Sequence, residues 1–506
     1  MMSEFQGHQL SLIASSFAVL CPTDLNLWEE LAAAIADNMA SFKPTQLSIA
    51  VWSFAKVGFQ KPRLFEALAH ASALQIRSFG RRQIAMLLAN FAESGFQDAK
   101  LFGAGSMAVL ADIDRFSTPD LVSIARAFSR VGRNEARLFK GLSLAMASRV
   151  SVFTPQQLSS VAWSFANVRI QDSDLLQAIS NETILKIKYF SAHGLSCTAW
   201  AFARTTGDIT IMYEAIATES ILKISGFSSQ GLDNMAWSFA SVRRHHQALF
   251  SVISHTFRAN SCRFNPTDLS HLAWSYAKLS KHDRGLFDKI STSVVATICG
   301  FSQQHTANVA WAFSTCGRND VAVFKAVAWH ASANTYNWTM QELGQLAWAF
   351  VEADLPADSA IDTLRDAIIH IARSNAWVNV ALERGPQRPD TIEAHCADIV
   401  CKMVPGASRN RYHQLGFEMD VVIFGANGKL IDFEIDELYH RSSRQRAVDA
   451  RRDALLQQLG IRIIRFDPFD VAGFERTHLE QAIAMELQMA GISASGEEGA
   501  TRSIPP

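Results

Sequence analysis

The chain has 506 residues, a formal net charge of −1 and seven cysteines. It is long enough for more than one domain, and its near-zero charge provides no global field for nucleic acid or membrane, so such a partner would have to meet a local patch. An odd number of scattered cysteines argues against a disulfide framework and favours a reducing compartment.

No apolar run approaches the roughly 18 residues that a membrane-spanning helix needs, so no membrane partner is expected. The start, MMSEFQGHQL, is acidic and lacks the Arg-rich character of an organellar transit peptide. We therefore expect either a cytosolic protein or a presequence that this chain does not contain.

An aromatic residue, here called the anchor, recurs every 37 residues over most of the chain. Another aromatic stands twelve residues before each anchor, and a bulky residue stands eleven after most of them. Ten copies without an insertion predict a repeat array. The anchors are Phe17, Phe54, Phe91, Phe128, Phe165, Phe202, Phe239, Tyr276, Phe313 and Phe350.

Each copy predicts two helices, since apolar residues recur at helical spacing on both sides of a Gly and Pro break, as at Gly58 and Pro62. A single hairpin cannot bury its apolar face, so neighbouring hairpins must stack into an α-solenoid over residues 1–372. Tryptophans two positions before the anchor are expected to pack in the core and between repeats. They are Trp52, Trp163, Trp200, Trp237, Trp274, Trp311 and Trp348.

Two positions of the first helix vary from copy to copy, five residues before the anchor and two after it. They share one stripe of the helix, and the small residues one before the anchor are expected to let a ligand approach between them. The alternative to ligand contact is a solvent-exposed helix face whose residues vary without functional constraint. In the first three copies, Leu12, Ile49 and Met86 suit apolar contacts or protein partners better than hydrogen bonds to RNA. The residues predicted to contact RNA are Ser123, Ser160, Asn234, His271, Asn308 and Gln345 at the first position and Lys56, Arg130, Asn167, Arg204 and Lys278 at the second.

The array resembles the heptatricopeptide repeats, relatives of the octotricopeptide repeats, over roughly residues 1–372. That resemblance implies organellar RNA binding, with the first helix of each repeat facing the RNA. Taking one base per repeat, the footprint is about ten nucleotides.

The 37-residue period ends after Phe350, and residues 373–390 are predicted as a linker. The following residues, 391–475, are predicted as a small α/β domain. Its expected elements are a helix at 392–403, strands at 417–424 and 429–436 around the turn GANG, an Arg-rich helix at 441–460 and a strand at 461–470. Residues 476–506 are predicted as a C-terminal helix and a flexible tail.

Three carboxylates of this domain form a candidate catalytic group. Asp420 stands in the first strand, and Glu434 and Asp436 lie two apart on the second, hence on one face. Such acids can hold a divalent metal for phosphodiester cleavage, and the alternative is that they pair with nearby arginines. The cations expected to meet phosphate oxygens are His440, Arg444, Arg446, Arg451 and Arg452.

Residues 417–471 resemble a RAP domain, a family similar to the PD-(D/E)xK endonuclease-like folds. The resemblance implies a restriction-endonuclease-like fold in which Asp420 and Glu434 match the metal-binding acids and Glu393 a helical acid. Asp436 stands where these folds have a lysine, and Glu437 and Leu438 replace a Gly-Pro pair, so catalysis is in doubt.

Both modules together predict a mainly α RNA-binding protein that processes, stabilises or assembles transcripts in mitochondria or plastids. The expected partners are single-stranded RNA, ribosomal RNA and ribonucleoprotein components, with no cofactor. The alternatives are an Mg²⁺-dependent endoribonuclease that uses Asp420 and Glu434, and an α-solenoid scaffold for other proteins.

Overall fold

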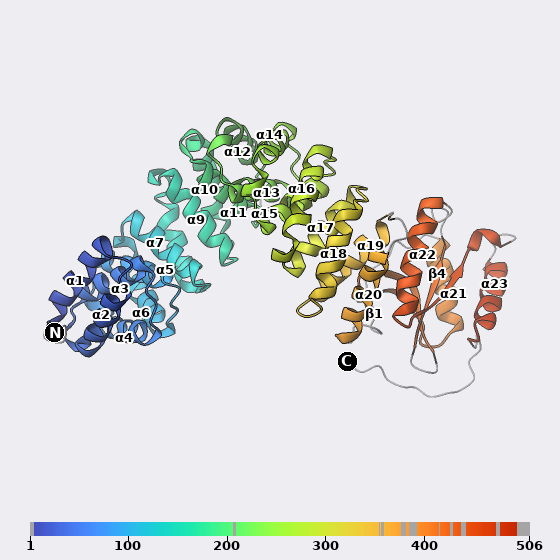
Figure 1. Ribbon diagram of the computed structural model, residues 1–506, viewed down its shortest axis with the longest axis horizontal. Coiled ribbons are helices and arrows are strands. Elements are labelled where there is room, and N and C mark those ends of the chain that lie inside the picture. The colour runs from blue at the N-terminus through green and yellow to red at the C-terminus, as the bar shows by residue number, and fades with distance from the viewer. Residues whose placement is uncertain are drawn as a thin grey trace. The chain divides into compact units, whose positions relative to one another are not determined.

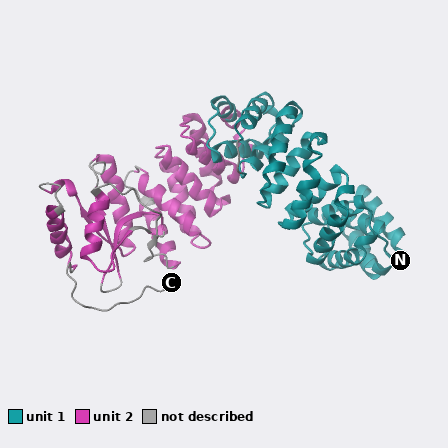
Figure 2. Cartoon of the chain, turned by 180° about the vertical axis from the view of Figure 1, so that it is seen from behind, with its two compact units in different colours: residues 1–253 teal, residues 254–506 magenta. Residues whose placement is uncertain are grey.

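The computed structural model describes residues 5–205, 209–353, 355, 359–375, 381–383, 392–413, 415–425, 429–436, 442–471 and 476–492. The chain divides into two compact units, residues 1–253 and residues 254–506 (Figure 2). The first contains repeats, and the second contains the last repeats and a small α/β module. None of the helices in the described ranges is both long and apolar enough to cross a membrane.

The twenty helices predicted from the 37-residue period are all present (Figure 1). The first helices are α1 (Gly7–Leu20), α3 (Pro44–Val57), α5 (Arg81–Glu93), α7 (Thr118–Arg130), α9 (Pro155–Asn167), α11 (Ala192–Phe202), α13 (Ser229–Ser241), α15 (Pro266–Lys278), α17 (Gln303–Thr315) and α19 (Met340–Glu352). The second helices are α2 (Leu25–Asp37), α4 (Pro62–Leu74), α6 (Ala99–Ala111), α8 (Ala136–Ala147), α10 (Ser173–Lys186), α12 (Thr210–Leu222), α14 (Gln247–Ala259), α16 (Arg284–Thr297), α18 (Val321–Ala333) and α20 (Ser359–Ser374).

A short 3₁₀ turn follows most of the second helices and leads into the aromatic that stands twelve residues before the next anchor. This aromatic is buried in most repeats, as is Phe116 after Ile113–Arg115. The other such turns are Met39–Ser41, Ile76–Ser78, Val150–Val152, Ile187–Tyr189, Ile224–Gly226, Ser261–Arg263 and Ile298–Gly300. The recurring aromatic therefore stands at the end of one repeat, where its packing holds the backbone in place before the next helix begins.

A polar residue eleven positions before the anchor begins each first helix from the fourth repeat onward. Its side chain accepts a hydrogen bond from a backbone N–H of the first helical turn, which stabilises such a helix by about 1 kcal/mol. These N-cap residues are Ser117, Thr154, Ser191, Ser228, Asn265, Ser302 and Thr339.

Aromatic pairs join consecutive repeats, as the stacking prediction requires. The aromatic eleven residues after one anchor meets the next anchor, mostly edge to face, and Phe102 and Phe128 have ring centroids 5.2 Å apart. Both rings are fully buried. Such pairs add about 0.5–1.5 kcal/mol beyond area burial. The other pairs are Trp28–Phe54, Phe65–Phe91, Phe139–Phe165, Tyr213–Phe239 and Phe287–Phe313.

The α/β module has a five-stranded sheet in the order β1-β2-β3-β4-β5, antiparallel except for the parallel pair β4 and β5. Helices α21 (Ile392–Met403) and α23 (Arg476–Met489) cover the apolar face of the sheet, and α22 (Ser443–Gln458) covers the other (Figure 1). The strands are β1 (Ala381–Glu383), β2 (Ser408–His413), β3 (Glu418–Phe424), β4 (Leu430–Ile435) and β5 (Arg462–Phe466). A 3₁₀ turn, Pro468–Asp470, follows β5.

The three predicted strands, the two predicted helices and the C-terminal helix are present in this module, but the last strand ends at Phe466 and not at residue 470 as predicted. Ala426–Gly428 of the predicted turn and residues 493–506 of the predicted tail lie outside the described residues. Two strands were not predicted. Three residues of the predicted linker form β1, and β2 has the polar sequence SRNRYH, which lacks the alternation that indicates a strand.

Candidate nucleic-acid interface

The first helices form the inner row of helices in each unit, since those of consecutive repeats generally lie closer together than the second helices do. We number positions from the anchor, so that −5, −2 and +2 denote residues before and after it. These three positions lie on the side of the helix away from the buried anchor, because two residues turn a helix by about 200°. We call the side chains at −5, −2 and +2 the inner stripe.

The polar residues predicted at −5 are neither sealed beneath neighbours nor fully exposed. Asn234, His271 and Asn308 are all half-buried. Neighbours along the stripe touch one another, since Gln345 Nε2 donates to Asn308 Oδ1 over 3.1 Å. The stripe is therefore continuous from one repeat to the next in this part of the array. Ser123 and Ser160 are half-buried in the same way.

The small residues at −1 do not lie on the stripe, and the prediction that they leave room for a ligand is wrong. Ser53, Ser164 and Ser275 have no exposed surface. The hydroxyl of Ser164 donates to the carbonyl of Ser160 within its own helix over 2.7 Å. Position −1 is turned about 100° from the anchor, so it faces a neighbouring helix and its small size allows the helices to pack closely.

Tryptophan at −2 occupies the middle of the stripe instead. Trp274, Trp311 and Trp348 are half-buried, and each successive pair has ring centroids 6.4 Å apart. Trp163 and Trp200 stack at the same distance with 30° between their planes. The predicted packing between repeats is confirmed, but burial in the core is not, because these indoles keep part of their surface exposed.

Cations at +2 lie over these indoles. Lys56 Nζ is 4.8 Å from the ring centroid of Trp52, and the Arg204 guanidinium is 4.7 Å from that of Trp200. Lys278 makes the same contact at 5.9 Å with Trp274, and Arg130 is exposed. Each contact joins residues four apart and brings a positive charge onto a partly exposed aromatic face.

Other +2 residues are less available to a ligand. Asn167 donates to the backbone carbonyl of Ser129 in the preceding repeat over 2.9 Å, and Glu93 pairs with Arg126 over 2.6 Å. In the first repeat, Leu12 and Val19 are 50% and 62% exposed and offer no hydrogen bond from their side chains. The polar and cationic character of the stripe is therefore greatest from the fourth repeat onward.

The three carboxylates predicted in the α/β module are only partly brought together. The register places Val421 opposite Phe433, so Asp420 falls opposite Glu434 on the face beneath α22. The Ile435 N–H donates to Asp420 Oδ2 over 2.7 Å. Asp436 lies apart from them and is paired with Arg465.

A third carboxylate of this group, Asp432, was missed in the sequence. It is fully buried, and its carboxyl lies against that of Glu434. The sequence could have indicated this residue, because Asp432, Glu434 and Asp436 alternate along one strand and therefore point to the same face of the sheet. Burial, with the nearby Glu434 charge, raises the pKa of Asp420 and of Asp432 well above the usual range for a carboxyl.

Arg452 lies beside this group and forms an ion pair with Glu434. Its Nη2 is 2.8 Å from Glu434 Oε2, and the side chain is 13% exposed. Burial by itself would lower the pKa of Arg452, but the carboxylates of Glu434, Asp432 and Asp453 raise it above the ordinary value. Arg452 is therefore an interior partner of the acids, which is the acid–arginine pairing of the alternative interpretation.

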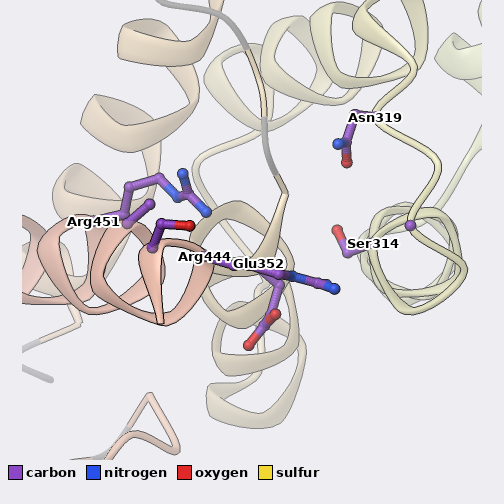
Figure 3. Close-up of a pocket in the computed structure, with 8 residues that line it drawn as sticks. Ser314, Asn319, Glu352, Arg444 and Arg451 are labelled. Atoms are coloured by element: carbon purple, nitrogen blue, oxygen red, sulfur yellow. The ribbon is translucent and has the colours of Figure 1, made fainter. Parts of the chain in front are cut away.

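The other predicted cations have different surroundings. Arg451 is half-buried and donates from Nε to the carbonyl of Val351 over 2.7 Å. Arg444 is exposed and lines a pocket between α22 and the last two repeats (Figure 3). His440 lies outside the described residues.

The residues present do not fit the magnesium site that a nuclease of the resembled fold would require. One of the two matching acids, Glu434, is ion-paired with the buried Arg452, and the other, Asp420, accepts a hydrogen bond from the Ile435 N–H. In the parts of the chain that the structure describes, no three His, Cys, Asp or Glu side chains are arranged to hold a metal ion.

One family model matches the chain, that of the RNA-editing substrate-binding complex 6 protein, over residues 1–222. The match covers the first six repeats and less than half of the chain. Among curated proteins, none matches the chain significantly. The array is thus similar to a component of an RNA-editing substrate-binding complex in its amino-terminal part.

Proposed function

We propose that this protein binds single-stranded RNA along the inner stripe and takes part in mitochondrial RNA processing. The similarity of residues 1–222 to an RNA-editing substrate-binding complex protein supports an RNA-related role within a larger assembly. The resemblance of the repeats to organellar RNA-binding arrays supports the same role. Ribonucleoprotein components are the partners that this proposal implies.

The observation that carries the proposal is the combination of a half-exposed indole with a polar side chain on one side and a cation on the other. In the eighth repeat these are Trp274, His271 and Lys278. An indole face can stack on any base, the polar group can distinguish base edges, and the cation can meet a phosphate. Each stacked base contributes about 1–3 kcal/mol, so a row of such positions needs no strong net charge.

For the carboxyl-terminal module we propose a RAP-like, restriction-endonuclease-like fold that supports RNA binding without cleavage. The pairing of Arg452 with Glu434 and the pairing of Asp436 with Arg465 support this choice over an active nuclease. With Mg²⁺ or Mn²⁺ we expect bound RNA to remain intact. Cleavage that disappears in both Asp420→Ala and Glu434→Ala would establish the endonuclease instead.

Selection of bound sequences from a pool of randomised single-stranded RNA tests the proposed RNA binding. We expect the full chain to enrich a motif, and Asn308→Ala to change the preferred base at one position and weaken binding of the selected RNA by about 1 kcal/mol, roughly fivefold. Thr292→Ala, an exposed residue of the second helix α16, is the matched control and should leave both unchanged.

Failure of the full chain to enrich any motif would contradict sequence-specific binding, and failure to bind RNA at all would favour the scaffold alternative. Binding should weaken as salt is raised, because phosphate contacts release counterions. Affinity that is independent of salt would argue against contact between the cations at +2 and the RNA backbone.

A further inference from the structure

A pocket of about 500 Å³ lies within the second unit, between the last two repeats and helix α22. Ser314 and Asn319 line it from the ninth repeat, Glu352 from the tenth, and Arg444 and Arg451 from α22 (Figure 3). Its volume falls in the range of sites that hold small organic ligands and exceeds the need of a single inorganic ion.

The pocket adjoins the inner stripe. Glu352 is the +2 residue of the tenth repeat, and Ser314 stands one position after the anchor of the ninth. The bond from Arg451 Nε to the Val351 carbonyl, 2.7 Å, attaches α22 at the same end of the first helix of the tenth repeat. A strand that follows the +2 edge of the stripe would therefore reach this pocket beside the last repeats.

The lining of the pocket is suited to a sugar–phosphate group. Arg444 is exposed and extends across the pocket toward the side of Ser314 (Figure 3). Two guanidinium groups against one carboxylate leave the lining with a net positive charge, and the planar guanidinium fork matches phosphate oxygens. The Glu352 carboxylate can accept a hydrogen bond from a ribose hydroxyl.

We propose that this pocket holds one nucleotide of the bound RNA strand beside the last repeats, with its phosphate on Arg444 and Arg451. This inference rests on the proposed function, because the strand is brought to the pocket by the inner stripe. The phosphate is either an internal phosphodiester or the terminal phosphate of a strand end, which share the same recognition chemistry. The positive amino-terminal end of α22 adds to the attraction of a phosphate.

Arg444→Gln tests the inference, since the side chain is exposed and the change should not affect folding. The full chain is titrated with one selected RNA at several salt concentrations. We expect Arg444→Gln to weaken binding on the order of fivefold and to reduce the slope of log affinity against log salt by about 0.7, the value for one phosphate contact on a single strand. Lys402→Gln removes one exposed charge from α21, on the other face of the sheet, and should change neither quantity.

The outcomes separate this inference from the proposed function. If the unaltered chain binds no RNA, the proposed function fails and this inference fails with it. If it binds RNA and Arg444→Gln matches Lys402→Gln in affinity and slope, only the pocket assignment is overturned.

Measuring the affinity for the same RNA with and without a terminal phosphate identifies which phosphate occupies the pocket. A gain in affinity from the terminal phosphate that disappears in Arg444→Gln assigns the pocket to a strand end. Equal affinities, together with weaker binding by Arg444→Gln, assign it to an internal phosphodiester.

Discussion

At the scale of single residues, the turn between the two helices of a repeat requires a left-handed backbone. The residue four positions after the anchor has a positive φ in most repeats, including Gly132 at 69° and Arg243 at 53°. Glycine adopts this conformation freely, whereas a residue with a side chain is strained by about 1–2 kcal/mol. The same turn is therefore relaxed in some repeats and strained in others. The strained positions are Arg169, Arg243 and Ser280.

Opposite substitutions at this position should have opposite effects on stability. Gly132→Ala should lower the free energy of unfolding by about 1 kcal/mol, because a Cβ there meets no atom within 4 Å and the cost is that of the backbone alone. Arg243→Gly should raise it by about 0.5–1 kcal/mol, the relieved strain less the added freedom of the unfolded chain. Denaturant unfolding measures both, and a shift of the same sign in both variants would contradict this account.

The angle around the helix axis between a residue and the anchor also decides the role of that residue. This angle follows from the number of residues between them and can be calculated from the sequence. Trp274 at −2 is turned away from the buried anchor and lies on the stripe, whereas Ser275 at −1 is turned toward a neighbouring helix. The spacing alone placed −5, −1 and +2 on one stripe of the helix. Spacing identifies residues that share a helix face, but only the burial of a known position such as the anchor identifies which face is covered.

At the scale of elements, period and pattern predicted those helices and strands that bury an apolar face. The twenty array helices and strands β3, β4 and β5 belong to this class. Strands β1 and β2 are held by pairing of their backbones, as in Leu382 opposite Tyr412. Their sequences do not alternate between apolar and polar residues, so they lack the pattern that indicates a strand. Likewise, the pairing of Arg452 with Glu434 joins a helix to a strand, and no local pattern indicates such a contact.

The contact between helices α17 and α18 should make stability depend on pH. His330 is buried, and its Nδ1 lies 3.2 Å from Thr306 Oγ1. Burial lowers the pKa of His330 below 6.5, and a hydrogen bond to the backbone of Phe301 opposes this only in part. The unfolded chain therefore binds more protons just below pH 6.5, so stability is full above that pH and is lost as pH falls through the folded pKa.

Thermal unfolding at pH 7.5 and pH 5.5 measures this dependence. We expect the unfolding temperature of the unaltered chain to fall more between the two conditions than that of His330→Gln. His70→Gln replaces an exposed histidine of the first unit and should show the same fall as the unaltered chain. An equal fall in all three proteins would exclude His330 as the cause.

At the scale of the whole molecule, each repeat contacts mainly its neighbours, so stability should be distributed along the chain and not held in one core. The aromatic pairs are among these local contacts. Phe139 meets Phe165 in the first unit and Phe287 meets Phe313 in the second, at centroid distances of 5.1 and 5.2 Å. Loss of one pair should therefore weaken its own surroundings first.

Phe139→Ala and Phe287→Ala form a reciprocal test of this expectation by native-state hydrogen exchange. Each removes a fully buried ring and should cost about 3–5 kcal/mol locally. Phe139→Ala should speed amide exchange in α8 and α9 and leave the α/β module unchanged, whereas Phe287→Ala should speed it in α16 and α17 and leave the first repeats unchanged. Faster exchange at every amide in either variant would mean that the chain unfolds as one cooperative unit, and stability would then not be distributed from repeat to repeat.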